Sequence, residues 1–214
     1  MKDYIKIEAK NYPEISLKVI PGHFATANSH INYFVDMSLM KARQSEANII
    51  AKAISEQYLA TTMVDTILCM DGCEVIGAYL ANYLTQTGFI SINSHKTLYV
   101  TTPEFSNNGQ LIFRENLQHM IQSRHVLLLM ASVTTGKTVS SAMDVIQYYG
   151  GKIAGISSIF SAMPSVKGYP INTLFTPNDL ENYRSYEPGE CELCKAGIPI
   201  DALANGFGYS SLSK

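Results

Sequence analysis

The amino-acid sequence predicts an α/β protein in which helices flank a mainly parallel sheet, with a small hood at the N-terminal end. Two patterns lead to this prediction. From residue 64 onward, continuous apolar runs typical of strands buried on both faces alternate with segments of helical period. Segments 4–9 and 15–20 instead alternate apolar and polar residues, as half-buried strands do. We therefore expect hood strands and a first helix over 1–60, a core over 61–180 and a C-terminal tail over 181–214.

The first sixty residues predict three strands and one helix. Strands are expected at 4–9, 15–20 and 33–35, and Pro21-Gly22 is expected to end the second of them. Between residues 39 and 59 the apolar positions change to a helical period and share one face. These positions are Ala47, Ile50, Ala51, Ile54 and Tyr58.

The core is expected to follow in alternating strands and helices. Residues 64–70 predict an apolar strand that ends in the turn pair Asp71-Gly72, and a helix follows at 75–84. Short strands are expected at 89–92 and 98–100, and 101–110 has the Pro, Ser, Asn and Gly content of a long exposed loop. Further strands are expected at 126–130, 153–160 and 171–175, with a helix at 137–149 between the first two. This order predicts right-handed crossovers in a parallel sheet.

Composition limits the function classes. The 214 residues carry a net charge of −2, which argues against a general nucleic-acid binder. Only 16% of residues are charged, against roughly 25% in a typical soluble chain, which favours a neutral surface or one covered by a second subunit. Residues 75–94 carry no charge, but their polar residues predict helix, turn and strand rather than a membrane span. With four cysteines and no apolar leader, we expect a cytoplasmic protein without membrane or nucleic-acid partners.

The segment after the strand at 126–130 is the best candidate for a ligand site. In a parallel sheet, ligands lie beyond the carboxyl ends of the strands. Gly136 would let the backbone approach a ligand, and the threonine hydroxyls and first helix amides would bind an anion such as phosphate. The alternative is that Thr134 or Thr135 only caps the helix. The predicted phosphate-binding residues are Ser132, Val133, Thr134, Thr135, Gly136, Lys137 and Thr138.

This segment resembles the phosphate-binding motifs of two families. It fits the P-loop pattern G-x-x-x-x-G-K-[ST] except that Ala131 replaces the first glycine, and the acidic residue expected on a downstream strand is missing. Residues 126–138, ending in Thr-Thr-Gly-Lys-Thr, more closely resemble the signature of the type I phosphoribosyltransferases. The orotate phosphoribosyltransferases are the most similar of these, because segments 22–36, 64–72, 144–153 and 191–199 resemble theirs in the same order.

The resemblance implies a function and a set of site residues. Residues 132–138 would hold the 5′-phosphate of phosphoribosyl pyrophosphate (PRPP) or of a nucleoside 5′-monophosphate, and the loop at 101–110 would close over the site. Mg²⁺ is a possible cofactor, and a homodimer is expected. Met70, Asp71 and Gly72 would form the pyrophosphate loop, and Phe24, Asn28 and Tyr33 would border the base.

The sequence departs from the family at positions that carry chemistry. Met130-Ala131 stand where the family has two acidic residues, the loop at 101–110 has no Lys or Arg, and the base-contacting Arg is missing from 160–165. Losing one donor to a leaving group commonly costs about 10²–10³ in rate. Lys41, Arg43 and Arg114 are the basic residues most able to compensate. The catalytic residues are therefore unknown, and three hypotheses remain open. The first is phosphoribosyl transfer to a base in pyrimidine nucleotide metabolism, and the second is a non-catalytic nucleotide-binding sensor or partner subunit of the same fold. The third, less favoured by the motif, is a P-loop nucleotide hydrolase.

No metal ligands are assigned from the sequence. Cys191-x-x-Cys194 could be half of a zinc site with Cys69-x-x-x-Cys73 as the other half, or all four could be ordinary thiols. His30, like His119 and His125, has no ligand spacing and is interpreted as structural.

Overall fold

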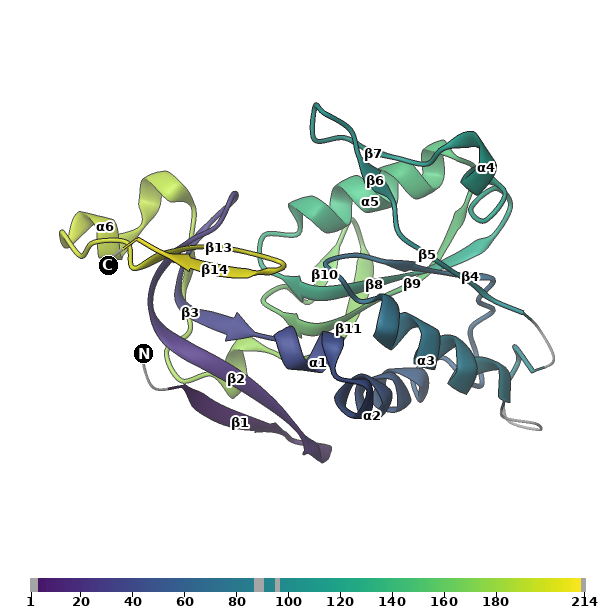
Figure 1. The fold of residues 1–214 in the computed structure, drawn as a ribbon, viewed down its shortest axis with the longest axis horizontal. Helices are drawn as coiled ribbons and strands as arrows, with labels where there is room; N and C mark the ends of the chain where they lie inside the picture. Colours follow the sequence, from purple (N-terminus) through teal and green to yellow (C-terminus); the bar gives the residue numbers. More distant parts are fainter. Residues whose placement is uncertain (1–3, 87–90, 95–96, 213–214) are drawn as a thin grey trace.

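The computed structural model describes residues 4–86, 91–94 and 97–212, and within these ranges most strands belong to two sheets (Figure 1). Both of these sheets have six strands, and we call the mainly parallel one the main sheet. Its spatial order is β10 (Ser165–Val166), β11 (Tyr169–Phe175), β9 (Lys152–Ser161), β8 (His125–Val133), β4 (Thr66–Cys69) and β5 (Tyr99–Thr101). All neighbours pair in parallel except β10 and β11. The predicted fold class is confirmed.

Helices cover both faces of the main sheet. Helices α2 (Gln44–Ser55) and α3 (Glu74–Gln86) share one hydrophobic cluster with Leu127 and Leu129 of β8. Helix α5 (Lys137–Tyr148) packs on the other face with Leu128 and Met130. Because successive strand residues point to opposite faces, the apolar run in β8 reflects burial on both sides.

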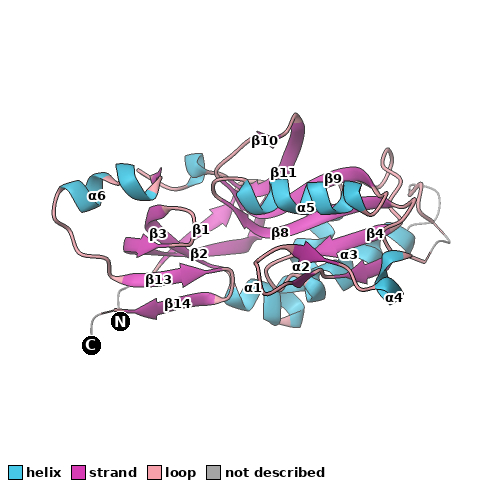
Figure 2. Ribbon diagram, turned by 90° about the horizontal axis from the view of Figure 1, so that it is seen from above, coloured by secondary structure: helices cyan, strands magenta, loops and turns pink. Residues whose placement is uncertain are grey.

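The second layer, which we call the hood sheet, joins the two ends of the chain (Figure 2). Its order is β12 (Ser185–Tyr186), β3 (His30–Asp36), β2 (Tyr12–Ala25), β13 (Ala202–Asn205) and β14 (Gly208–Ser211), with β1 (Ile5–Ala9) also on β2. Strand β13 runs parallel to β2. The segment 181–214 that we expected to form a tail therefore contributes strands to the hood.

Several predicted boundaries were wrong. Strand β2 continues through Pro21-Gly22 to Ala25, because a register shift against β3 between Pro21 and Phe24 absorbs the irregular backbone. The helix predicted at 39–59 is split into α1 (Ser38–Ala42) and α2 by Arg43, whose backbone is extended (φ −83°, ψ 119°).

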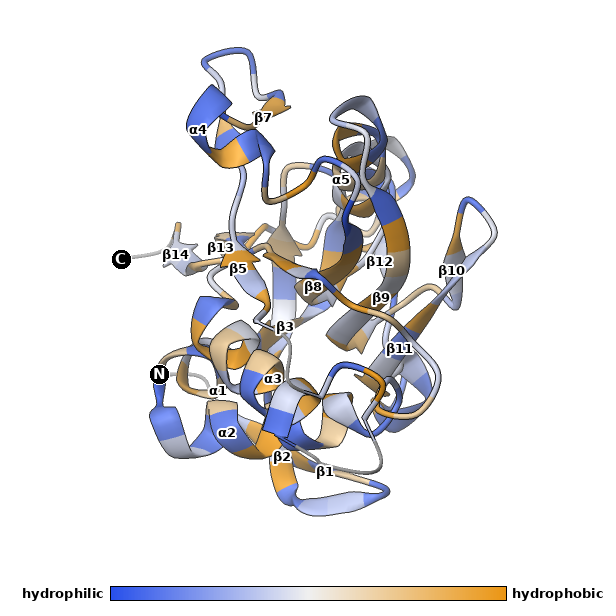
Figure 3. Ribbon diagram, turned by 90° about the vertical axis from the view of Figure 1, so that its right-hand side faces the viewer, coloured by the Kyte–Doolittle hydropathy of each residue, from blue (hydrophilic) through white to orange (hydrophobic). Residues whose placement is uncertain are grey.

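The segments around the long predicted loop also differ from expectation. The strand predicted at 89–92 lies partly outside the described residues, and Ser91 and Ile92 are in no strand. The loop predicted at 101–110 contains β6 (Glu104–Phe105), which pairs with β7 (Leu111–Ile112) in a small hairpin. Hydrophilic residues, blue in Figure 3, dominate the adjoining α4 (Glu115–Gln118). Among the described helices, none is long and apolar enough to cross a membrane.

Candidate functional site

A cavity lies at the point in the main sheet, between β4 and β8, where the order of strand addition reverses. From β4 the chain crosses through α3 to β5 on one side, and from β8 it crosses through α5 to β9 on the other. The loops after β4 and β8 therefore diverge and leave a crevice at the carboxyl ends of these neighbouring strands. The crevice is lined by the loop after β8, by Asp71 after β4, and by parts of the hood.

The end of β8, the loop after it and the first turn of α5 form one wall of the cavity. All seven residues from Ser132 to Thr138 line it. Gly136 precedes α5 in the left-handed conformation (φ +73°), and a Cβ there would lie 2.8 Å from Val166 Cγ2 and 3.0 Å from Met163 Sδ. Both the backbone angle and the tight packing thus require glycine at this position. The twelve-residue helix α5 begins at Lys137, so its first amides point toward the cavity.

The loop after β4 brings one carboxylate to the cavity. Asp71 (φ +55°) and Gly72 (φ +78°) form a left-handed turn, and Asp71 lines the cavity while Met70 and Gly72 do not. The Asp71 carboxylate accepts a hydrogen bond from the backbone N–H of Ala131. Burial raises the pKa of Asp71 above its ordinary value, although the Lys41 ammonium and the Ala131 amide act in the opposite direction.

Lys41 of α1 is the basic residue that sequence reasoning singled out and the structure places at the cavity. Its ammonium donates hydrogen bonds to the backbone carbonyl of Asp71, at 2.6 Å, and to that of Gly206. It also lies 5.9 Å from the centre of the Phe207 ring. Lys41 therefore connects the loop after β4 to the C-terminal hairpin.

The turn of the β13–β14 hairpin closes one edge of the cavity, which the sequence analysis missed. Residues 204–208 line the cavity, and a Cβ on Gly206 would lie 2.9 Å from Asp71 Oδ1. The Asn205 carboxamide oxygen accepts hydrogen bonds from the amides of Phe207 and Gly208. The dipeptide Asn205-Gly206 between alternating residues was the available signal for this hairpin.

Tyr183 is a second residue that the sequence analysis missed. Its side chain lines the cavity, hydrogen-bonds with the Thr134 hydroxyl and packs against Phe160 with ring centres 5.2 Å apart. Burial raises the pKa of Tyr183 to about 12. The phenol is therefore a neutral group that holds the phosphate-loop candidate in place.

The hood contributes only part of the predicted base side. Asn28 lines the cavity, in a turn where the Thr26 hydroxyl accepts hydrogen bonds from the amides of Asn28 (3.2 Å) and Ser29 (2.9 Å). Phe24 and Tyr33 are not among its lining residues. Phe24 is buried instead between Phe34 and Tyr209, at ring-centre distances of 5.7 and 5.9 Å. Phe34, one strand away, lines the cavity in its place.

The described cavity lining holds no second carboxylate that could replace the acidic pair of the signature that residues 126–138 resemble. Met130 and Ala131 are both 1% exposed, and Asp71 is the one carboxylate among the described cavity-lining residues. Arg114 lies outside the lining and forms a two-point ion pair with Glu104 of β6, at 2.8 and 2.6 Å. Arg114, just after the β6–β7 hairpin, is therefore already paired with the glutamate of β6.

The cavity lining offers Mg²⁺ one carboxylate and no other acidic ligand among the described residues. Mg²⁺ is usually held by one or two carboxylates together with substrate phosphates and water. Here the single carboxylate is Asp71, which is half-buried, accepts the Ala131 amide hydrogen bond and lies near the Lys41 ammonium. A bound phosphate ligand would have to supply most of the remaining oxygens.

Comparisons with known proteins agree with this geometry. No family model matches the chain. An orotate phosphoribosyltransferase of Caldicellulosiruptor saccharolyticus is 36% identical over 81 residues, which span 37% of this chain and only 40% of that protein. The orotate phosphoribosyltransferase of Chlorobaculum parvum is 25% identical over 86% of this chain and 88% of that protein.

Solved structures show the same fold. The orotate phosphoribosyltransferase of Mycobacterium tuberculosis in complex with PRPP superimposes with a TM-score of 0.50, at 14% identity over 69% of this chain and 82% of that chain. The chain therefore has the type I phosphoribosyltransferase fold. In sequence it resembles the orotate phosphoribosyltransferases, at low identity.

Proposed function

We propose that this protein binds PRPP or a nucleoside 5′-monophosphate in the cavity between the hood and the main sheet. The observation that carries the proposal is the position of residues 132–138, all of which line the cavity at the start of α5. A phosphate dianion there would meet the helix amides, the hydroxyls of Thr135 and Thr138, and the Lys137 ammonium. The PRPP complex of the Mycobacterium tuberculosis protein supports this class of ligand.

The rest of the ligand would extend toward the hood. Asn28 and Phe34 border that side of the cavity, and Phe160 lies beside the phosphate loop. We propose that the ribose crosses the space near Asp71 and that the base lies against these hood residues. If the protein is active, the ring nitrogen of a pyrimidine such as orotate attacks ribose C1 of PRPP, the bond from C1 to the pyrophosphate oxygen breaks, and pyrophosphate leaves.

A second candidate is a non-catalytic relative that senses the nucleotide or serves as a partner subunit. The neutral, buried Met130-Ala131 pair favours it, because the acidic residues that the family places there are missing. The Glu104–Arg114 pair favours it as well, since no free cation from this hairpin is available to a departing pyrophosphate. The homodimer and the cytoplasmic location expected from the sequence remain predictions.

Isothermal titration with PRPP, uridine and orotidine monophosphates, and ATP, each with and without Mg²⁺, tests the ligand class. Thr138→Val should weaken binding of the phosphate ligand by about 10-fold or more, because a hydrogen bond to a charged group contributes about 1.5–3 kcal/mol. Thr61→Val, at an exposed position away from the cavity, is the matched control and should change nothing. Binding of ATP in preference to PRPP and the monophosphates would contradict the proposal.

Release of pyrophosphate in the presence of orotate separates the two candidates. Turnover that falls in Thr138→Val but is unchanged in Thr61→Val would establish the transferase. PRPP binding without turnover on orotate, uracil or any purine base would establish the non-catalytic relative.

A further inference from the structure

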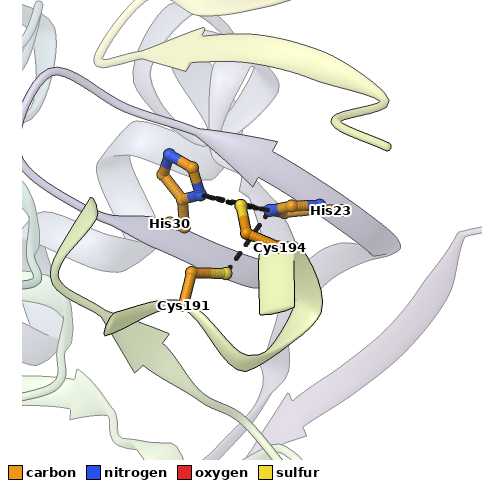
Figure 4. A group of neighbouring side chains, drawn as sticks. All are labelled: His23, His30, Cys191 and Cys194. Atoms are coloured by element: carbon orange, nitrogen blue, oxygen red, sulfur yellow. Dashed lines mark hydrogen bonds between the residues drawn. The ribbon is translucent and has the colours of Figure 1, made fainter. Parts of the chain in front are cut away.

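Four metal-ligating side chains from opposite ends of the sequence meet beneath the hood sheet (Figure 4). His23 lies in β2, His30 in β3, Cys191 just before α6 (Glu192–Lys195), and Cys194 within it. One nitrogen or sulfur atom from each lies within 4.8 Å of all the others. In Figure 4 the four side chains point toward a common centre.

The distances between these atoms match a tetrahedron around one ion. With Zn–N of about 2.0–2.1 Å and Zn–S of about 2.3 Å, two nitrogens lie about 3.3 Å apart, and a nitrogen and a sulfur about 3.6 Å apart. His23 Nε2 lies 3.2 Å from His30 Nδ1. It lies 3.5 Å from Cys191 Sγ and 3.6 Å from Cys194 Sγ, and Cys194 Sγ lies 3.3 Å from His30 Nδ1.

Hydrogen bonding alone does not explain why the four groups converge. His23 Nδ1 lies 3.0 Å from the carbonyl oxygen of Ile198, which can only accept, so Nδ1 carries the proton. In the neutral ring Nε2 then presents a single lone pair to His30 and both thiols. A metal ion would satisfy all four ligands at once, and the bond from Nδ1–H to a backbone carbonyl is the usual second-layer contact of a metal-bound histidine.

We infer that His23, His30, Cys191 and Cys194 form a structural Zn²⁺ site. Two thiolates and two imidazoles in tetrahedral geometry suit Zn²⁺ rather than the oxygen-seeking Mg²⁺ or Ca²⁺. All four positions are filled by the protein, so the site has no open position for substrate or catalytic water. It is separate from the cavity, because none of the four residues lines it.

This assignment corrects the pairing considered from the sequence. Cys69 and Cys73 belong to the main hydrophobic core, where both side chains are 0% exposed and burial raises the pKa of each thiol. They are not in the cluster. The inference also gives His30, interpreted from the sequence as structural, a role as a ligand. His23 lies on the strand next to that of His30. The two cysteines are far away in sequence: Cys194 is 164 residues from His30, and Cys191 is 168 residues from His23.

The metal would fasten the C-terminal segment to the hood. Beyond the cluster, the His23 amide donates to the Asp201 carboxylate at 2.8 Å, and the Asp201 amide donates to the His23 carbonyl at 2.8 Å. Strand β13 begins at the next residue and pairs with β2. The ion therefore anchors the base of the hairpin whose turn closes the cavity.

Metal content of the full chain, purified without a chelating affinity step, tests the inference. Mass spectrometry should find about one zinc per chain, and Co²⁺ exchanged into the site should give the visible bands of a tetrahedral complex together with sulfur-to-cobalt charge transfer. His30→Gln and Cys194→Ser should lower Zn²⁺ affinity by more than the roughly 10–100-fold loss that follows removal of an outer contact. His119→Gln, which changes a histidine outside the cluster, is the matched control and should retain full metal content.

Measurements on the unmodified protein guard against variants that fail to fold. Removing the metal with a chelator should make Cys191 and Cys194 reactive toward an alkylating reagent, while Cys69 and Cys73 remain protected, and it should speed amide exchange in β13. Wild-type protein without zinc that also gives no tetrahedral Co²⁺ spectrum would overturn the inference. A Cys191–Cys194 disulfide in the freshly purified protein would overturn it as well. Each result is independent of whether the cavity binds PRPP.

Discussion

Replacing Lys41 with methionine tests how the C-terminal hairpin is held over the cavity. Methionine keeps the apolar stem and the volume of the side chain but removes the ammonium. The carbonyls of Asp71 and Gly206 then lose their shared donor, and the turn of the hairpin loses its direct bond to the loop after β4. We expect the hairpin to become less protected and the protein to become less stable.

The magnitude follows from the two hydrogen bonds. A hydrogen bond from a charged donor contributes about 1.5–3 kcal/mol. We expect a total loss of about 1.5–3 kcal/mol, rather than twice that, because the cavity is open and water can replace the ammonium at the carbonyls. For a chain of this length, a urea dependence of about 3 kcal/mol per molar gives a midpoint shift of about 0.5–1 M.

Urea unfolding followed by circular dichroism, together with hydrogen exchange, measures both effects. Lys52→Met is the matched control, because Lys52 is an exposed lysine on the neighbouring helix α2, where surface changes usually stay within about 0.5 kcal/mol. The amides of Phe207 and Gly208 should exchange faster in Lys41→Met, whereas the Asp201 amide, bonded to His23, should not change. Equal midpoints and equal exchange in the two variants would refute the bridging role of Lys41.

Three further predictions concern the site and its support. Gly136→Ala should destabilise the protein by about 2–4 kcal/mol, because the backbone is left-handed and the new Cβ would clash with Val166 and Met163. Gly168→Ala is the control: Gly168 is also left-handed (φ +81°) but faces open space, so the loss should be only about 1–2 kcal/mol. Equal losses in the two variants would contradict the packing argument. Burial raises the pKa of Asp71 in the folded state above its ordinary value of 3.8. The folded state therefore favours the protonated carboxyl, and the stability gained from this is lost as pH rises from about 3.8 through the raised pKa. Asp71→Asn should therefore gain stability relative to wild type as the pH of urea titrations rises above about 4, and a constant difference would refute this. Tyr58→Phe should lower the free energy of unfolding by about 1–3 kcal/mol, because the Asn172 side-chain amide, which donates to the Tyr58 hydroxyl at 2.8 Å, loses this acceptor. An unchanged midpoint in thermal or urea unfolding would show that water replaces the hydroxyl.

The sequence was sufficient for the main sheet because its signals are local. The apolar run in β8 and the threonine-rich loop that follows lie within fourteen residues, so period and motif identify strand, loop and helix together. The positions of Ser132 to Thr138 at the cavity follow directly from that order. The same comparison with the phosphoribosyltransferase signature predicted that Met130 and Ala131 stand where that signature has two acidic residues.

The hood could not be predicted in the same way, because its contacts are between distant segments. Nothing near Phe24 in sequence shows that Tyr209 packs on its ring and turns it away from the cavity. Tyr183 contacts Thr134 in the loop after β8, about fifty residues away in sequence. Lys41 contacts the hairpin turn at Gly206, 165 residues away. The strand through Pro21-Gly22 was missed for a related reason, since pairing with β3 overrides the local tendency of this dipeptide to turn.

The shared hood sheet has a consequence for how the chain is made. The last strand of the main sheet ends at Phe175, but β2 receives its β13 neighbour only when residues 202–205 have been synthesised. A chain that ends between these points contains every main-sheet strand but lacks the hairpin that forms one edge of the cavity. During synthesis the main sheet is thus complete before the strands that close the cavity edge, so translation order determines when the cavity can form in full.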